Sequence, residues 1–300
     1  MEGQVPDFLQ KKLVNQYGED LFQKILSGYR AKRFVTLRVN TLKTNVDFVK
    51  DLLKTAGISY QKVSWSKEAL IVQEIKEAAI WELPVYKEGG VYLQSLSSMI
   101  PPVFLDPKGG ENILDMAAAP GGKTTQMAAL SGGRAQITAC EKNKIRAERL
   151  RYNLEKQGAA NVYLMVADSR KLDDFFSFDK ILLDAPCSGS GTLKLEEQGL
   201  KQNITEELVS RSAKTQEELL KKALKLLKPG HEMIYSTCSI LADENEAIIE
   251  KVLGKSAEIV PISPEELPDL PLLPVSIQGT LCICPDKFYE GFFVAKIRKR

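Results

Sequence analysis

The sequence predicts an α/β protein with a mostly parallel, doubly wound sheet, preceded by a small α/β domain. From residue 109 onward, short apolar strands alternate with helical segments, which is the pattern of parallel strands joined by crossover helices. Several of these strands end in turns of small and polar residues, where ligands of open α/β sheets bind. The first ninety residues carry a separate set of helix and strand patterns. We therefore expect two domains, residues 1–90 and residues 91–300.

Composition narrows the class of protein. The 300 residues are 44% hydrophobic, and 41 basic residues nearly balance 39 acidic ones. These values exclude a disordered chain and a uniformly basic nucleic-acid binder, so any nucleic-acid contact is expected to be local. No apolar run approaches the roughly 20 residues that span a bilayer, and the start MEGQVPDFLQKKL lacks the layout of a signal peptide. We expect a cytoplasmic protein without a membrane segment.

The five cysteines are odd in number and unevenly spaced, which predicts free thiols rather than a disulfide framework. They are Cys140, Cys187, Cys238, Cys282 and Cys284. A zinc site is not expected, because the chain has one histidine and the pair at 282 and 284 is too closely spaced for the usual ligand pattern.

The N-terminal region begins with a helical stripe of apolar residues over 8–25 that Gly18 interrupts. It continues with an alternating strand over 34–40, a helix over 45–56 and two extended pieces over 60–65 and 69–72. Residues 29–46 contain no acidic side chain and five basic ones, which are Arg30, Lys32, Arg33, Arg38 and Lys43. This stretch fits either a phosphate-binding surface or an ordinary solvated face.

The larger region should supply the sheet. Its expected strands are 112–116, 135–140, 162–166, 180–184, 232–236 and 291–297. The expected helices are 121–129, 143–156, a leucine-rich segment that ends before Pro229-Gly230, and one that begins at Asp243 with Glu246 in a capping-box position. Five prolines within 255–275 predict a surface connection with one short helical turn at SPEE.

The loop after the first of these strands, residues 115–124, reads DMAAAPGGKT. Its small residues let backbone N–H groups approach a ligand, and the helix that follows favours a negative group at its N-terminus. The tail GKT copies a P-loop, but Ala117 stands where that motif needs its first glycine, which argues against a nucleoside-triphosphate site.

Two acidic residues end the next two strands. Glu141 lies about 20 residues beyond the glycines, the usual spacing for an acceptor of ribose hydroxyl hydrogen bonds, and Asp168 could accept from an adenine amino group. Each acid alone could be a helix N-cap. Together with the loop they predict a nucleoside pocket, without separating a methyl donor from a dinucleotide.

Two thiols follow the next strands, Cys187 in DAPCSGSG and Cys238 in STCS. Cysteines are often small buried hydrophobes, which is the interpretation we adopt for the other three. Cys187 and Cys238 instead end apolar strands inside polar, small-residue loops, where a thiolate can form and react.

These residues resemble the Nol/Nop/Sun family of RNA cytosine-5 methyltransferases over most of the chain. The resemblance depends on AAPGGKT at 118–124, DAPCSGSG at 184–191, STCS at 236–239, RVNTLK at 38–43 and GFFVAKIRK at 291–299. It implies a Rossmann-like class I methyltransferase domain, an RNA-recognition-like first domain, and S-adenosylmethionine as the cofactor. The implied cofactor contacts are Ala117, Ala118, Ala119, Pro120, Gly121, Gly122, Lys123, Glu141, Asp168 and Asp184.

The resemblance also implies a mechanism. Cys238 would attack carbon 6 of cytosine, Asp184 would stabilise charge at ring nitrogen 3, and Cys187 would help to release the product. The implied substrate is a cytosine in single-stranded or looped ribosomal or transfer RNA, with ribosomal RNA slightly favoured. Arg38 and Lys43 are the first candidates for RNA contacts, and Lys296, Arg298, Lys299 and Arg300 could hold the flanking backbone. We expect a monomer without a metal.

Two alternatives stay open. A DNA cytosine-5 methyltransferase would use Cys187 as its nucleophile, which would leave Cys238 without a role. A non-catalytic RNA-binding or assembly protein would keep the pocket and do no chemistry. Residues 192–201, TLKLEEQGLK, lack the basic, proline-containing run of many family members.

Overall fold

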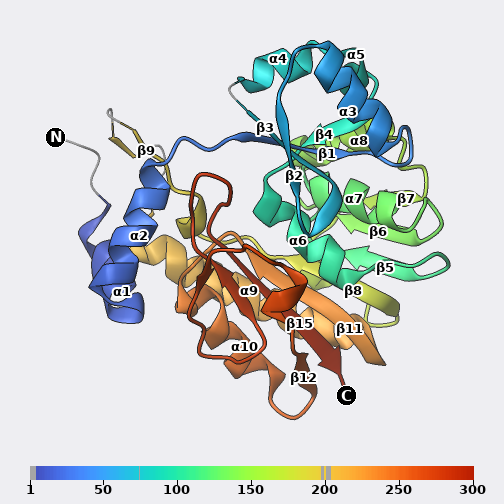
Figure 1. The fold of residues 1–300 in the computed structure, drawn as a ribbon. Coiled ribbons are helices and arrows are strands. Elements are labelled where there is room, and N and C mark those ends of the chain that lie inside the picture. Colours follow the sequence, from blue (N-terminus) through green and yellow to red (C-terminus); the bar gives the residue numbers. More distant parts are fainter. Residues whose placement is uncertain (1–4, 74, 197–198, 201–203) are drawn as a thin grey trace.

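The computed structural model describes residues 5–73, 75–196, 199–200 and 204–300. Within this part of the chain, a nine-stranded sheet forms the centre of the molecule, with the order β13-β14-β15-β11-β8-β5-β6-β7 and β12 paired to β15 (Figure 1). Five neighbouring strands are parallel: β7 (Val162–Met165), β6 (Gln136–Cys140), β5 (Asn112–Asp115), β8 (Phe178–Asp184) and β11 (Leu227–Thr237). This mostly parallel sheet confirms the predicted fold class.

The remaining strands of this sheet run antiparallel. They are β15 (Phe292–Lys299), β14 (Leu281–Ile283), β13 (Leu272–Leu273) and β12 (Ala257–Val260). The chain travels outward from β5 through β6 to β7, and then returns to place β8 on the other side of β5. The order reverses between β5 and β8, and a crevice opens at such a point beyond the carboxyl ends of the strands.

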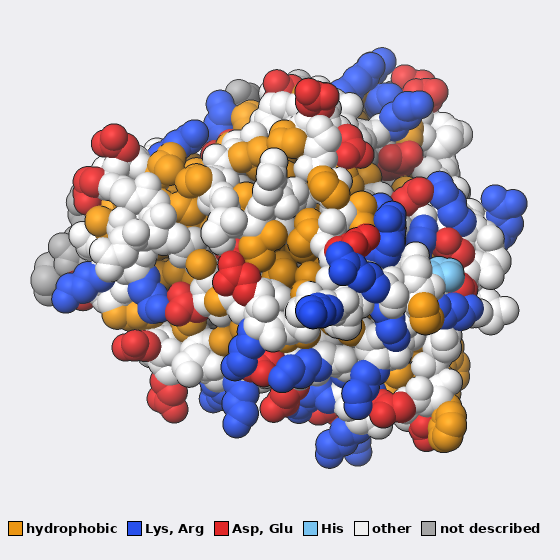
Figure 2. Space-filling model, turned by 90° about the horizontal axis from the view of Figure 1, so that it is seen from below, with side chains coloured by type: hydrophobic (Ala, Val, Ile, Leu, Met, Phe, Trp, Pro, Cys, Tyr) orange, Lys and Arg blue, Asp and Glu red, His pale blue; other side chains and the backbone are white. Residues whose placement is uncertain are grey.

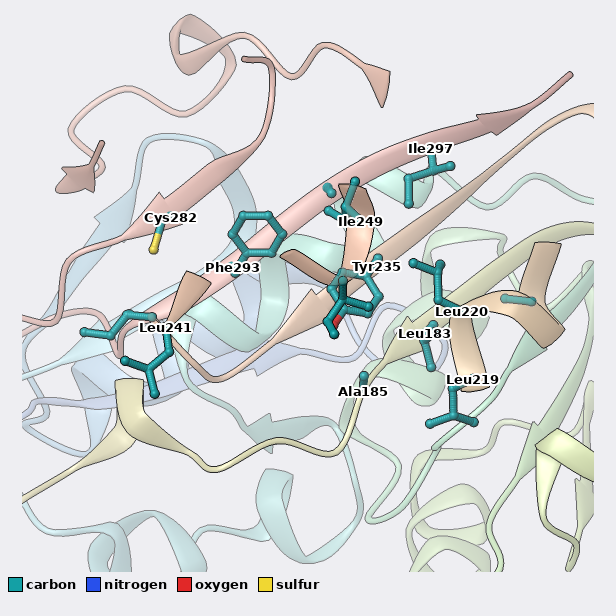
Figure 3. Close-up of a cluster of buried hydrophobic side chains, with 14 of the residues drawn as sticks. Leu183, Ala185, Leu219, Leu220, Tyr235, Leu241, Ile249, Cys282, Phe293 and Ile297 are labelled. Carbon is teal, nitrogen blue, oxygen red and sulfur yellow. The ribbon is translucent and has the colours of Figure 1, made fainter. Parts of the chain in front are cut away.

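Helices cover both faces of the large sheet. On one face, α6 (Leu96–Leu105), α7 (Gly122–Leu130) and α8 (Lys144–Gln157) share a buried apolar cluster with the strands. On the other face lie α9 (Glu206–Leu226) and α10 (Glu246–Leu253). Successive strand residues alternate between the two clusters, as the two-residue period of a strand requires. Leu182 belongs to the cluster that contains α6, whereas Leu183 lies near Leu219 and Leu220 of α9 (Figure 3).

The small N-terminal sheet has the order β2-β3-β1-β4 and is antiparallel. Its strands are β1 (Val35–Val39), β2 (Tyr60–Val63), β3 (Ser66–Val72) and β4 (Val91–Leu93). Its buried cluster is shared with α3 (Val46–Thr55), α4 (Glu77–Trp81) and α5 (Pro84–Lys87). Asn45 caps α3, the helix expected over 45–56, by accepting a hydrogen bond from the Phe48 amide.

The first two helices belong to the larger core. The predicted interruption at Gly18 separates α1 (Asp7–Tyr17) from α2 (Glu19–Arg30), and both pack into the cluster of α9 and α10. In addition, β4 lies beyond residue 90 and pairs with β1 of the small sheet. The division into residues 1–90 and 91–300 stays a prediction. Both contacts cross that boundary: α1 and α2 pack on the larger domain, and β4 completes the smaller sheet.

Several local predictions need correction. The proline-rich stretch 255–275 is not only a surface connection, because it contains β12 and β13; its turn at SPEE is a short 3-10 helix with a capping box. Pro229-Gly230 lies inside β11, where the pairing with β8 shifts register. The helix expected from Asp243 begins at Glu246, after a 3-10 turn η3 (Ala242–Glu244), and Asp243 forms an ion pair with Lys12 at 2.6 Å instead of a cap.

The structure also contains one helix that the sequence did not predict, and it describes only part of the segment 192–201. Helix α6 was not predicted, because Pro101 and Pro102 lie inside it and proline normally marks a helix boundary. Of the segment 192–201, residues 197, 198 and 201 lie outside the described residues; β9 (Leu195–Glu196) and β10 (Gly199–Leu200) pair within it.

Candidate active site

Three loops meet at the carboxyl edge of the large sheet, following β5, β8 and β11. The parallel pairing of β8 with β11 sets Asp184 opposite Ser236, so the two cysteines that follow become neighbours. The Sγ atoms of Cys187 and Cys238 are 3.1 Å apart, and both side chains are partly buried. Two thiols separated by 51 positions in the sequence therefore lie in direct contact.

Two cavities adjoin at this point. The first has a volume of about 240 Å³ and reaches from Glu141 and Asp168 to both cysteines. The second, of about 340 Å³, extends from Cys238 toward the N-terminal sheet, α6 and β15. The lining residues common to both are Ala117, Ala119, Asp184 and Cys238. Cys238 and Asp184 therefore form part of the wall of each cavity.

The first cavity has the acceptors that a nucleoside requires. Glu141 is 4% exposed; one of its carboxylate oxygens accepts from the Asn143 amide at 2.8 Å and the other lies 3.3 Å from Arg146. Asp168 pairs with Arg170 at 2.6 Å, and the hydrogen bond from that guanidinium lowers the pKa of the Asp168 carboxyl. An ionised carboxylate is an acceptor only, which suits donors such as ribose hydroxyls and an adenine amino group. The residues present fit an adenosyl group.

The residues of the loop after β5 divide between the two cavities. Ala117 and Ala119 line both, whereas Ala118, Pro120, Gly122 and Lys123 line the second. Gly121 supports the turn: its φ is +110°, and a Cβ there would lie 2.9 Å from Leu150 Cδ1.

Asp184 is held by two partners. Its carboxylate lies 2.7 Å from Lys123 Nζ and accepts a hydrogen bond from Ser236 Oγ at 2.9 Å. The same ammonium donates to Ser98 Oγ at 2.8 Å and lies 5.3 Å from the centre of the Phe292 ring. Lys123, expected to contact the cofactor, is thus placed in the second cavity beside Asp184.

Asp115 is a residue of this region that the sequence did not single out. It is 1% exposed, lines the second cavity and accepts from Thr124 Oγ1 at 2.7 Å, while its other oxygen has no hydrogen-bond partner within the described residues. Burial raises the pKa of Asp115 to about 6, against the opposing effect of the Thr124 hydrogen bond. The position of Asp115 at the end of β5 was the sequence feature that could have identified it as a residue of the site.

The environment of Cys187 favours its protonated form. Its hydrogen bond with Cys238 and its burial raise the pKa of the Cys187 thiol well above the usual value, and the charge of Glu244 adds to the effect. Cys187 can therefore act as an S–H donor toward the Cys238 sulfur. The remaining cysteines, Cys140, Cys282 and Cys284, are buried free thiols away from the two cavities, as predicted.

The expectation for Arg38 is corrected by its burial. Arg38 is 2% exposed and donates to Gln94 Oε1 and Thr125 Oγ1, both at 3.0 Å, so it links β1 to α7 instead of facing solvent. Lys43 is exposed and donates to the Glu88 carbonyl at 2.9 Å. Its contact with RNA stays a prediction.

The C-terminal basic residues, which were expected to hold the RNA backbone, do not lie beside the two cysteines. Arg298 lies opposite Glu232 in the middle of β11, whereas Cys238 follows the end of that strand. Lys296 and Arg298 pair with Glu232, and Arg300 pairs with Glu258. Lys299 donates to the Leu227 carbonyl at the start of β11. These basic side chains therefore have partners away from the end of β11 that leads to Cys238. The face visible in Figure 2 likewise mixes Lys and Arg with Asp and Glu.

Two absences hold for the described residues. They contain no group of three or more His, Cys, Asp or Glu side chains arranged to hold a metal ion. None of their helices is both long enough and apolar enough to cross a membrane.

The sheet order, the cavity at its switch point and the acidic strand ends define a class I methyltransferase, a fold that binds S-adenosylmethionine. Residues 102–298 match the model of the family described as 16S rRNA methyltransferase RsmB/F, and residues 5–77 match its RsmF/B-like ferredoxin-like domain. The chain belongs to this family of S-adenosylmethionine-dependent methyltransferases.

Curated relatives include proteins named ribosomal RNA small subunit methyltransferase F. The one from Shewanella oneidensis is 34% identical over 88% of this chain and 57% of its own length; the one from Salmonella paratyphi B is 35% identical over 93% and 60%. The chain thus spans somewhat more than half the length of these relatives.

Solved structures agree on the fold. A methyltransferase homologue from Pyrococcus horikoshii is 34% identical, with a TM-score of 0.85 over 99% of this chain and 96% of its own. NSun6 from the same organism, solved with SFG, has a TM-score of 0.87 at 24% identity over 98% of each chain and supports the fold alone.

Proposed function

We propose that this chain transfers a methyl group from S-adenosylmethionine to carbon 5 of a cytosine in RNA, with Cys238 as the nucleophile. The single observation that carries the proposal is the contact of two thiols, 3.1 Å apart, where two cavities adjoin. One cavity suits the adenosyl group of the methyl donor. The other is then available for the target base, with Cys238 accessible from both.

The reaction needs a thiol because carbon 5 of cytosine is a poor nucleophile. Addition of the Cys238 thiolate to carbon 6 forms a carbon–sulfur bond and makes carbon 5 part of an electron-rich enamine. S-adenosylmethionine supplies the electrophilic methyl group: carbon 5 bonds to it with the enamine electron pair as the methyl–sulfur bond breaks, which leaves S-adenosylhomocysteine. Loss of the carbon 5 proton then lets the Cys238 sulfur depart as a thiolate.

Cys187 is the proposed acceptor of that proton. The raised pKa of its thiol keeps it protonated while Cys238 is free, which favours Cys238 as the attacking group. Bonding of the Cys238 sulfur to carbon 6 removes the first cause of the raised pKa, namely the hydrogen bond between the two sulfurs. Cys187 then loses its proton to water more easily, and the resulting thiolate can accept the proton from carbon 5.

Asp184 and Lys123 are the proposed electrostatic pair for the base. Negative charge builds on the pyrimidine ring when the thiolate adds, and a cation close to the ring stabilises it. The ammonium of Lys123 lies 2.7 Å from the Asp184 carboxylate, and both residues line the second cavity. We therefore propose that Lys123 stabilises the charge on the ring, and that Asp184 orients Lys123 and the base.

RNA is the proposed substrate class, with ribosomal RNA slightly favoured over transfer RNA. The names of the curated relatives, ribosomal RNA small subunit methyltransferase F, support this choice. A base must leave its stack to enter a cavity behind Cys238, which costs a few kcal/mol and least in a loop or single strand. Unpaired cytosines are accordingly the proposed targets.

The alternative of a DNA-type enzyme, with Cys187 as nucleophile, is less well supported because the pKa of the Cys187 thiol is raised rather than lowered. A non-catalytic RNA-binding protein would have no use for two thiols in contact at a cofactor cavity.

The test compares two cysteine variants with a buried control. Cys238→Ala should abolish transfer of labelled methyl to RNA, Cys187→Ala should accumulate a covalent protein–RNA adduct, and Cys284→Ala should do neither. Bisulfite mapping of ribosomal and transfer RNA with and without the protein would identify the modified base. Adduct formation by Cys238→Ala, or methyl transfer at wild-type rate by that variant, would refute the proposal.

A further inference from the structure

A buried carboxylate lies directly behind the two thiols. Glu244, at the end of η3, has no exposed surface, and neither cavity includes it in its lining. One of its carboxylate oxygens accepts from the Ser188 amide at 2.7 Å, and the other accepts from Ser188 Oγ at 2.5 Å. Ser188 is the residue after Cys187, so Glu244 fixes the backbone and side chain immediately beyond that thiol.

The same turn holds the loop of the other cysteine. Asn245 Nδ2 donates to the Ser239 carbonyl at 3.0 Å, and Thr237 Oγ1 donates to Asn245 Oδ1 at 2.5 Å. These two residues flank Cys238. The buried Tyr235 hydroxyl donates to the Glu244 carbonyl at 2.6 Å, which fixes the turn against β11.

A carboxylate without solvent contact is costly to bury, and its hydrogen bonds must offset the lost hydration. Two short hydrogen bonds from Ser188 stabilise the Glu244 carboxylate in this way. The same bonds hold the loop of Cys187 against the turn that contacts the loop of Cys238. An apolar side chain would pack in this position at lower cost but would leave the Ser188 amide and hydroxyl without an acceptor.

We propose that Glu244 is a positioning residue that holds Cys187 and Cys238 at reaction distance. The expected effect on catalysis rests on the proposed function, whereas the effect on the positions of the two cysteines does not. Glu244 touches neither cavity, so it acts through Ser188 and, with Asn245, through the loop of Cys238.

A second effect follows from charge. The groups that raise the pKa of Cys187 are Cys238, through the hydrogen bond and its charge, and Glu244, together with burial; the Gly189 amide opposes them. Burial raises the pKa of Glu244 itself, and its hydrogen bonds with Ser188 oppose that effect. In its ionised form Glu244 raises the pKa of the Cys187 thiol, so Glu244→Gln should lower that pKa. Glu244 thus helps to keep Cys187 protonated while Cys238 attacks.

The first experiment is kinetic. Glu244→Gln should lower kcat for methyl transfer by about 10- to 100-fold, the effect of misplacing reacting groups by a fraction of an ångström to 1 Å, with KM for S-adenosylmethionine unchanged. Glu246→Gln is the matched control, because Glu246 is also a buried carboxylate, 4% exposed, two residues along the chain, and makes no hydrogen bond to either cysteine loop among the described residues. It should retain the wild-type kcat.

The second experiment needs no methyl transfer. The pH dependence of iodoacetamide alkylation at Cys187, followed by peptide mass spectrometry, should move to lower pH by about one unit in Glu244→Gln, as expected for removal of a nearby charge at an effective dielectric constant of about 20. Ser188→Ala breaks the same link but keeps the charge. It should lower kcat with a smaller change in the alkylation profile.

The outcomes separate the two proposals. If the wild-type protein makes no 5-methylcytosine, the proposed function fails, while the alkylation profile still tests Glu244. If Glu244→Gln and Glu246→Gln behave alike in both kcat and the alkylation profile, Glu244 has no positioning role.

Discussion

Replacing Gly191 with alanine should damage the site from outside its cavities. Gly191 follows the loop of Cys187 and packs backbone to backbone against Gly291. A Cβ on Gly191 would lie 2.0 Å from the Gly291 carbonyl oxygen, where ordinary contact begins at 3.4 Å. Neither partner is a flexible side chain, so the two segments have to separate by roughly 1 Å or more in a close-packed interior.

This displacement should also move Cys238, because Gly191 is hydrogen-bonded to its backbone. The Gly191 amide donates to the Cys238 carbonyl at 2.9 Å, and the Gly291 amide donates to the Gly191 carbonyl at 2.8 Å. Overpacking of this kind costs about 1–3 kcal/mol, and each kcal/mol lowers Tm by about 2–4 °C in a protein of this size. A displacement of about 1 Å at the reacting atoms should lower kcat by about 100-fold.

The assay combines thermal unfolding with methyl transfer at saturating substrates. Gly110→Ala is the control for the clash: unlike Gly191, Gly110 has a positive φ, +86°, but a Cβ there meets nothing within 4 Å. That control should lose about 1 kcal/mol from backbone strain and keep its kcat. Wild-type Tm and kcat in Gly191→Ala would refute the reasoning.

Further predictions concern pH and the basic residues. Because the folded-state pKa of Asp115, about 6, lies above the ordinary 3.8, Asp115 contributes stability that is present below pH 3.8 and lost as the pH rises through 6. Asp115→Asn should therefore raise the free energy of unfolding at pH 8, by at most about 3 kcal/mol, and not at pH 3.5; urea titrations at both pH values check this, and equal effects would contradict it. Arg38→Ala should lower Tm, since it breaks the buried link to Gln94 and Thr125, without changing the salt dependence of RNA binding beyond that of the wild type. Lys43→Ala should leave Tm unchanged and reduce the salt slope by about one if Lys43 meets a phosphate, whereas an unchanged slope would exclude that contact.

Much of the fold follows from local patterns. The six strands expected in the larger domain are present, because their apolar runs end in loops that carry glycine, proline or small polar residues. Helix α8 begins after Asn143 and is followed by Gly158, both as capping rules predict. Helix α6 was missed for the opposite reason: two prolines interrupt a helix whose burial against β8, β11 and β15 stabilises it.

The roles of the basic residues could not be read from their order. Arg38 and Lys43 lie five positions apart in one motif, yet one is buried between two elements and the other is exposed. The C-terminal cations lie in or directly after the last part of β15, and the antiparallel direction of that strand places them away from the cysteines. Strand direction and depth depend on long-range pairing, which local sequence does not encode.

The sequence by itself determined the kind of chemistry, because thiols, carboxylates and a loop of small residues occur at successive strand ends. This pattern can be recognised without knowing the distances between these groups in space. Only the tertiary structure decided that Cys187 and Cys238 touch, that Lys123 pairs with Asp184, and that Glu244 lies behind both cysteine loops. The physical reason is distance: a contact between residues about 50 positions apart is fixed by strand order and register, and these emerge only when the whole sheet forms.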